Sequence, residues 1–243
     1  MNMKTTRLIA LSILAFSLAA NLLSQTADEI ISKYIQVIGG KERLSKITSV
    51  YAESTIEAMG AQGIIKSTTL NGKGMRTDIE IGGFNITSCY TDKEGWSLNT
   101  MIGNSSAKIM PSAEYNLGKD QIIIGGPFIN YAEKGYKVEL LGTDTIANAI
   151  SYKIKFTSPD SVLSVCFFDA RTFYLVQAVS QSVAAGQIVE GVTNYSDFRQ
   201  ADGYTIPYKT ELSLAGGQYI NDMKVTKVEL NKPVDELIFK KPE

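Results

Sequence analysis

The amino-acid sequence predicts a mainly β, antiparallel fold of the sandwich or barrel type. From residue 50 onward, apolar and polar residues alternate with a period of two, in segments that begin about every 8–14 residues. Glycine, asparagine and aspartate separate these segments, and the connections are too short for a parallel crossover. No repeat of about 20–50 residues is present in the sequence. We therefore expect a single β domain over residues 26–243.

Residues 1–25 have the pattern of a cleavable signal peptide. Lys4 and Arg7 precede an apolar stretch over 8–23, which is shorter than the roughly 20 residues that a membrane-spanning helix needs. Small residues that suit cleavage follow at Ala19, Ala20 and Ser24. A buried N-terminal helix or an uncleaved anchor is the alternative that this order of segments disfavours. No cysteine precedes Cys89, so we expect an exported chain that is neither lipidated nor anchored in a membrane.

The composition argues against several classes of function. The formal net charge is −1 and the charges are scattered, which disfavours binding to nucleic acid or to an anionic membrane surface. The chain has no histidine, which removes histidine-activated nucleophiles and the commonest transition-metal ligand. Its two cysteines, Cys89 and Cys166, lie in predicted strands, and we favour two buried thiols over a disulfide. We expect no metal site, no cofactor and no catalytic residue.

Two helices open the predicted mature chain. Apolar residues recur at helical spacing over 27–38, Gly39-Gly40 ends this helix, and 41–47 adds one or two further turns. The period then changes to two, and Asn71 to Gly74 forms a strong hairpin signal. The first run of predicted strands covers 50–58, 63–70, 75–81, 84–91 and 96–100.

The middle of the chain, 101–131, interrupts the alternation. A short helix is predicted from Ala113 to about Ile123, and Gly125-Gly126-Pro127 ends it. The second run of predicted strands covers 136–146, 150–157, 162–169, 173–180, 186–199, 205–214 and 218–230.

Polar clusters offer little catalytic potential. Arg76, Asp78 and Glu80 share one face of a strand, and a solvated charged face explains them better than an acid–base pair does. Gly72-Lys73-Gly74 and Gly82-Gly83 are hairpin turns, because neither follows a buried parallel strand and opens a helix as phosphate-binding loops do. No serine lies in a G-x-S-x-G motif.

Four motifs, in order along the chain, resemble one family. They are IGGKERL (38–44) at the end of the N-terminal helix, TDKEGWSL (91–98), CFFDARTFYLVQ (166–177) with an Asp-x-x-Thr turn between two strands, and NYSDFRQADGYTIPYK (194–209) with KVTKVELNKPVDELIFKKP (224–242). On these motifs the chain resembles the LolA-like periplasmic lipoprotein-carrier superfamily, the outer-membrane lipoprotein-sorting proteins. The match covers nearly the whole predicted mature chain.

The resemblance implies an incomplete β-barrel of the LolA/LolB-like kind, with the N-terminal helix and the short mid-chain helix packed on its concave side. It implies a periplasmic, monomeric carrier that binds the acyl chains of lipoproteins or another hydrophobic ligand, without cofactor or catalysis. Related folds serve as envelope sensors that bind a protein partner, which is the alternative function; an enzyme is a third. The best-studied carriers have an Arg-Pro pair where this chain has Asn71 to Gly74, so the identity of the ligand stays open.

Alternation along the strands predicts which apolar side chains share a face and are candidates to line a hydrophobic pocket. These candidates are Met75, Ile79, Ile81, Trp96, Leu98, Ile154, Phe156, Val165 and Phe167. An ordinary β core is the alternative role for all of them, and alternation does not tell which face is concave.

Overall fold

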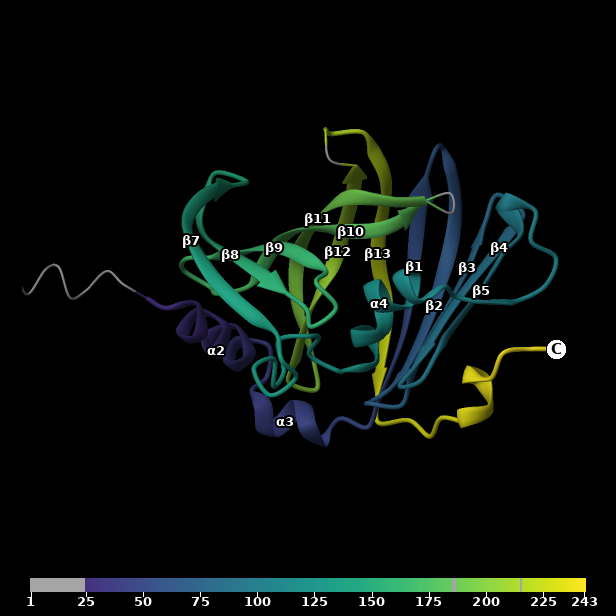
Figure 1. Cartoon of the computed structure of the whole chain (residues 1–243), viewed down its shortest axis with the longest axis horizontal. Coiled ribbons are helices and arrows are strands. Elements are labelled where there is room, and N and C mark those ends of the chain that lie inside the picture. The colour runs from purple at the N-terminus through teal and green to yellow at the C-terminus, as the bar shows by residue number, and fades with distance from the viewer. Residues whose placement is uncertain (1–24, 185–186, 215) are drawn as a thin grey trace, which may run out of the picture.

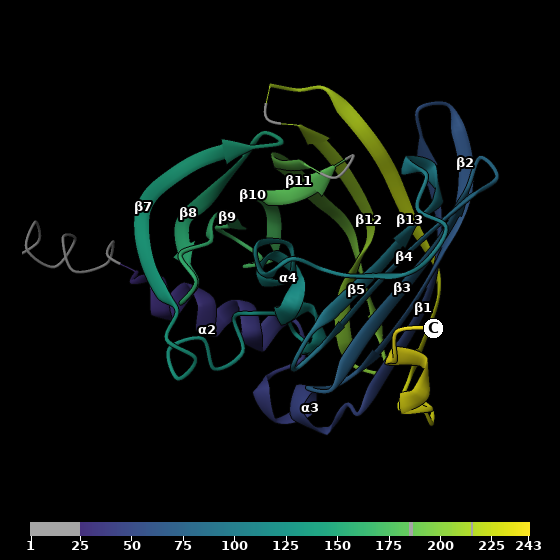
Figure 2. The ribbon, with the colours of Figure 1, turned by 45° about the vertical axis from the view of Figure 1, so that its right-hand side comes forward.

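The computed structural model describes residues 25–184, 187–214 and 216–243. Residues 1–24 of the predicted signal peptide lie outside these described residues. Within them, thirteen strands form one antiparallel sheet that curves without closing (Figures 1 and 2). The predicted mainly β, incomplete barrel is therefore confirmed. No helix in the described part of the chain is long and apolar enough to span a membrane.

Two helices precede the sheet, as predicted. Helix α2 (Ala27–Val37) begins at Thr26, whose hydroxyl accepts a 3.2 Å hydrogen bond from the amide of Glu29, while the Glu29 carboxylate accepts one of 3.0 Å from the amide of Thr26. The helix buries Ile30 and Ile31 completely. Helix α3 (Lys41–Lys46) follows two glycines with positive φ and buries Leu44.

The sheet has two halves, each built from strands that are neighbours in the sequence. One half holds β1 (Ser49–Ala58), β2 (Ala61–Leu70), β3 (Gly74–Ile81), β4 (Phe84–Thr91), β5 (Gly95–Asn99) and the short β6 (Lys108–Ile109). The other holds β7 (Lys137–Ile146), β8 (Ala149–Thr157), β9 (Leu163–Asp169), β10 (Leu175–Ala184), β11 (Gln187–Ala201), β12 (Tyr204–Leu214) and β13 (Tyr219–Leu230). Pairing of β1 with β13 joins the halves, which leaves β6 and β7 as the edges.

The segment between the two edge strands, residues 110–136, lies inside the curve of the sheet and is called the mid-chain segment below (Figure 2). It contains α4 (Ser112–Gly118) and the 3-10 helix η2 (Lys119–Ile122), so the predicted mid-chain helix is present but ends earlier than expected. The sequence also did not indicate β6 or the 3-10 helix η1 (Thr100–Ile102), which are too short to show a period.

The C-terminal segment, residues 231–243, lies on the opposite side of the sheet from α4 (Figures 1 and 2). It carries the 3-10 helix η3 (Glu236–Phe239), and Phe239 packs with Cys89 and Trp96 in a buried cluster. Arg76 donates a 3.1 Å hydrogen bond to the carbonyl of Ile238, so the predicted charged face of β3 is partly covered by this segment rather than fully solvated.

The main core lies between α2, the mid-chain segment and β8 to β10. Tyr34 of α2 packs edge-on against Phe128 and Phe168, with ring centroids 5.3 Å apart in both pairs. Ile154 and Cys166 belong to the same buried cluster. Both Cys89 and Cys166 are free and buried, in agreement with the favoured prediction of two buried thiols. This core fixes α2 and Phe128 beneath one end of the concave space.

Candidate functional site

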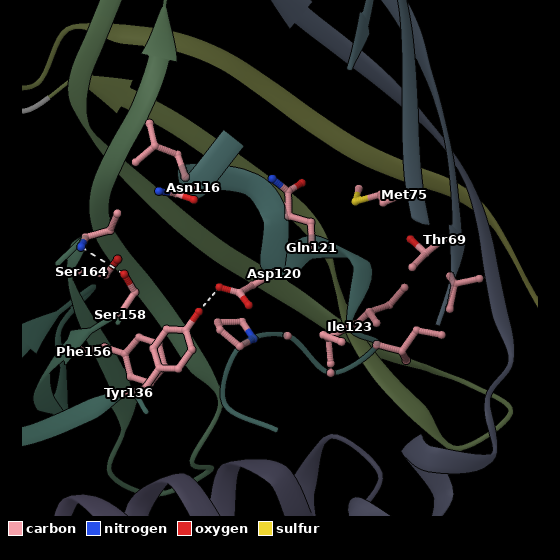
Figure 3. A pocket seen from close by; sticks show the side chains of 18 of the residues that line it. Thr69, Met75, Asn116, Asp120, Gln121, Ile123, Tyr136, Phe156, Ser158 and Ser164 are labelled. Carbon is pink, nitrogen blue, oxygen red and sulfur yellow. Dashed lines mark hydrogen bonds between the residues drawn. The ribbon is translucent and has the colours of Figure 1, made fainter. Parts of the chain in front are cut away.

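A cavity of about 410 Å³ lies between the mid-chain segment and the concave face of the sheet (Figure 3). Both halves of the sheet contribute to its wall. The lining residues from the sheet and its turns are Val50, Thr69, Met75, Phe156, Ser158, Val162, Ser164, Tyr204 and Ile206. Those from the mid-chain segment are Asn116, Leu117, Asp120, Gln121, Ile123, Ile124, Gly125, Gly126, Pro127 and Tyr136. The volume is within the usual range of pockets for small ligands, about 300–1,000 Å³.

The register of the strands explains which side chains reach the cavity. Val50 of β1 stands opposite Thr69 of β2, and Thr69 stands opposite Met75 of β3, so the three point to the same face. In the other half, Phe156 of β8 stands opposite Ser164 of β9. The ring of Tyr136 stacks on that of Phe156 with centroids 4.7 Å apart, which closes this end of the cavity.

The turn between β2 and β3 holds the mid-chain segment in place. Asn71 accepts a 3.1 Å hydrogen bond from the amide of Ile124 through Oδ1, and its Nδ2 donates one of 3.0 Å to the carbonyl of Ile47. The amide of Gly72 donates a 2.8 Å hydrogen bond to the carbonyl of Ile122. The stretch that departs from the Arg-Pro pattern of the carriers therefore forms the anchor of the cavity wall.

Two contacts hold α4 against β4 on the other side of the segment. The hydroxyl of Tyr115 donates a 2.9 Å hydrogen bond to the carbonyl of Thr91. Gly118 lies so close to the ring of Tyr90 that a Cβ atom at this position would overlap it. Gly118 is needed for this close approach and not for its backbone angles, since its φ of −119° suits any residue.

The polar groups of the cavity include one carboxylate. Asp120 accepts a hydrogen bond from the hydroxyl of Tyr136, and burial, together with this bond, raises the pKa of the Tyr136 phenol. Close by, Lys119 forms an ion pair with Asp160. Lys134 Nζ is buried with no hydrogen-bond partner among the described residues, and its burial lowers its pKa while the charge of Asp120 partly offsets that effect.

Two further hollows adjoin the cavity. One of about 560 Å³ lies on the other side of α4 and shares Leu117 and Gln121 with it. Another of about 240 Å³ shares Tyr204 and Ile206 with it and reaches Tyr34 of α2. The mid-chain segment thus separates three adjoining hollows within the concave space.

Of the nine predicted lining residues, two line the cavity and three more lie on the same face. Met75 and Phe156 are in its wall. Ile154 is fully buried in the main core beside Phe156. Ile79 and Ile81 pack with Ile56, Ile65 and Met223 in a separate cluster, farther along the concave side of β3.

The other four predicted residues point to the opposite face of the sheet. Trp96 packs against Phe239 of the C-terminal segment, and Leu98, two positions along β5, shares its face. Val165 and Phe167 stand opposite Lys155 and Lys153, on the face of β9 that does not contact α2. Period two predicted which residues group together, but it did not tell which group faces the cavity.

The residues that the sequence did not indicate come mostly from the mid-chain segment. Leu117, Ile123 and Pro127 belong to the stretch where the alternation stops, so they have no strand face to be assigned to. The interruption itself was the available signal, since a long irregular stretch inside a compact β domain is commonly functional. Among the described residues, no group of three or more acidic or cysteine side chains is placed to hold a metal ion.

No family model and no curated protein sequence matches the chain. Solved structures do match. A LolA superfamily protein from Nitrosomonas europaea is 16% identical, with a TM-score of 0.59 over 90% of this chain and 99% of its own. A DUF1329 family protein from Desulfovibrio piger is 11% identical, with a TM-score of 0.58 over 89% and 98%.

A third similar structure is a putative outer membrane lipoprotein-sorting protein domain from Vibrio parahaemolyticus. It is 12% identical, with a TM-score of 0.53 over 86% of this chain and 97% of its own. The three matches span nearly the full length of each of these structures. They show that this chain has a LolA-like fold, as the sequence motifs predicted.

Proposed function

We propose that this chain is an exported binding or carrier protein for acylated or other lipid-like ligands, and that the apolar part of the ligand occupies the cavity behind the mid-chain segment. The observation that carries the proposal is the cavity of about 410 Å³ itself. Apolar side chains from both halves of the sheet and from the mid-chain segment converge on it, among them Met75, Phe156 and Ile123. Burial of an acyl chain there would be favourable by about 0.8 kcal/mol for each methylene group.

The proposal extends to export and to domain organisation. Residues 1–25 are the signal peptide, residues 26–243 act as one domain, and the periplasm is the compartment where the protein acts as a monomer. The LolA-like fold supports this, because the match to the Vibrio parahaemolyticus lipoprotein-sorting domain covers most of both chains. No cofactor and no catalytic step are needed for such a role.

The test begins with the full chain expressed for export and purified without detergent. Lipid extraction and native mass spectrometry should reveal a bound acyl compound, and the delipidated protein should take up a fluorescent acyl probe. Met75→Trp places a larger side chain in the cavity wall and should weaken probe binding by about tenfold or more. Leu98→Trp makes a comparable change on the opposite face and should leave binding unchanged. A folded protein that yields no lipid and takes up no acyl probe would overturn the proposal.

A second candidate function is binding of a protein partner. It is favoured by the edge of the sheet at β7, which pairs only with β8 among the described strands. An open strand edge presents unpaired backbone groups to which an extended peptide can add. Pull-down from an envelope fraction separates the two functions, because a stoichiometric protein partner without bound lipid would favour this one.

A further inference from the structure

The cavity has a polar end and an apolar end. Figure 3 shows Asn116, Asp120, Ser158 and Ser164 gathered near the ring of Tyr136, while Met75, Thr69 and Ile123 lie at the other end. The polar end is built by α4, η2, the turn between β8 and β9, and the start of β9. The apolar end is built by β1 to β3 with the residues after η2. The lining therefore suits an amphiphile with its head group beside Asp120.

The charges around the polar end restrict this head group. Asp120 is the only charged side chain among the residues that line the cavity, and no lysine or arginine is among them. Two lysines near the polar end do not line the cavity: Lys119 is paired with Asp160, and Lys134 is buried, which lowers its pKa. An anionic head would lose its hydration and find no cation in the wall, and transfer of an unpaired charge from water is costly.

A cationic head is also disfavoured. The charge of Lys134, although it makes no direct contact with Asp120, lies within the electrostatic reach of that carboxylate and of Glu133, and so partly offsets the negative charge at this end. The Tyr136 hydroxyl occupies one oxygen of Asp120 by hydrogen bonding. The groups that remain for a ligand are mostly neutral and can form hydrogen bonds. They are the hydroxyls of Ser158 and Ser164, the side-chain amides of Asn116 and Gln121, and the second oxygen of the Asp120 carboxylate.

We propose that the cavity selects single-chain amphiphiles with an uncharged, hydroxyl- or amide-bearing head, such as monoacylglycerols, over fatty acids and alkylamines of the same chain length. This inference rests on the proposed function and specifies the ligand class of the same cavity. A hydroxyl of the head donates to Asp120 and accepts from the serines or amides, so that each buried polar group has a partner. The carboxylate of a fatty acid has only acceptors and lies beside the like charge of Asp120.

The experiment measures binding of 1-monolauroylglycerol, laurate and dodecylamine to the delipidated full chain, each below its micellar concentration, at pH 7. The glyceride should bind about tenfold more tightly than either charged amphiphile. Laurate or dodecylamine binding as tightly as the glyceride would overturn the inference and leave the proposed function standing. Binding of none of the three, with the chain folded, would overturn the proposed function itself.

A charge variant tests the reason for the selectivity. Gln121 is exposed on the wall of the cavity, so Gln121→Lys adds a cation beside the head group and should improve laurate binding by about tenfold. Gln36→Lys makes the same change at an exposed position of α2 that does not line the cavity, and it should leave laurate binding as it is in the parent chain. Equal laurate affinities in the two variants would contradict the electrostatic argument.

Discussion

The indole nitrogen of Trp96 donates a 2.8 Å hydrogen bond to the carbonyl oxygen of Phe239, and the thiol of Cys89 donates a longer one of 3.4 Å to the same oxygen. All three residues are buried on the outer face of the sheet, away from the cavity. The C-terminal segment is thus tied to the strands by one buried carbonyl with two donors. This arrangement explains why the single tryptophan, which the sequence placed among the candidate ligand contacts, packs instead beneath the C-terminal segment.

Trp96→Phe should destabilise the protein without affecting ligand uptake. The six-membered ring is kept, but the pyrrole ring and with it the stronger donor to the Phe239 carbonyl are lost, and a weakened bond at a buried acceptor alone costs about 1–3 kcal/mol. Urea unfolding followed by circular dichroism measures the loss. Binding of the acyl probe should equal that of the parent chain, and a weakened affinity at unchanged fold would place Trp96 at the ligand after all.

Asn71→Ala should loosen the mid-chain segment. The variant leaves the buried amide of Ile124 without its acceptor and the carbonyl of Ile47 without its donor, which we expect to cost about 1–3 kcal/mol in unfolding free energy. Amide hydrogen exchange should accelerate selectively at residues 122–126. Asn85→Ala, at an exposed position of β4, is the matched control and should change neither quantity. If amide exchange at residues 122–126 were equally fast in the two variants, the turn would not anchor the segment.

Gly118→Ala should be destabilising because of Tyr90 and for no other reason. The added methyl group would overlap the ring, and overpacking of this kind costs about 1–3 kcal/mol. In a Tyr90→Leu background the ring is gone, so the same glycine substitution should cost little. A double-mutant cycle from urea unfolding measures this coupling, and additive effects of the two substitutions would refute the contact.

The buried thiols should make stability fall at alkaline pH. Burial raises the pKa of Cys89 and of Cys166 from the ordinary 9.0 to about 12 in each case. A group whose pKa is raised on folding contributes its full stabilisation below the unfolded pKa and loses it as the pH rises toward the folded pKa. The free energy of unfolding should therefore decline from about pH 9 toward pH 12.

Thiol reactivity and a cysteine variant check that prediction. Native protein at pH 8 should react with a disulfide reagent only as fast as it unfolds, and both thiols should react at once in urea. Cys166→Ala should make the alkaline decline shallower, since one of the two groups no longer ionises on unfolding. An equally steep decline in the variant would assign the alkaline sensitivity to the tyrosines.

Local patterns predicted most of the fold. The first strand was expected over 50–58 and spans Ser49–Ala58, and the hairpin signal at Asn71 to Gly74 falls between β2 and β3. The Asp-x-x-Thr turn is also confirmed, because Asp169 accepts a 2.7 Å hydrogen bond from the amide of Thr172. Such features depend on residues a few positions apart, so the sequence alone is enough to indicate them.

The cavity was less predictable because its wall depends on contacts between distant parts of the chain. Alternation grouped Met75 with Ile79 and Ile81, and Trp96 with Leu98, but which group faces the cavity depends on the curvature of the whole sheet. Trp96 is covered by Phe239, which lies far from it in the sequence. The polar end depends on Asp120 and Tyr136, which come together only when the mid-chain segment folds back inside the sheet.

The pairing of β1 with β13 has a consequence for how the chain folds. Val50 stands opposite Leu230, so the first and last strands of the sheet meet at its centre, while each half is a series of neighbouring hairpins. Hairpins between adjacent strands form early, since closing a short loop costs little entropy. The central ladder must wait for two remote stretches of chain to find each other, and contacts of such long sequence separation slow folding. We expect the two halves to acquire structure first and the β1–β13 ladder to be the late, rate-limiting step that shapes the cavity.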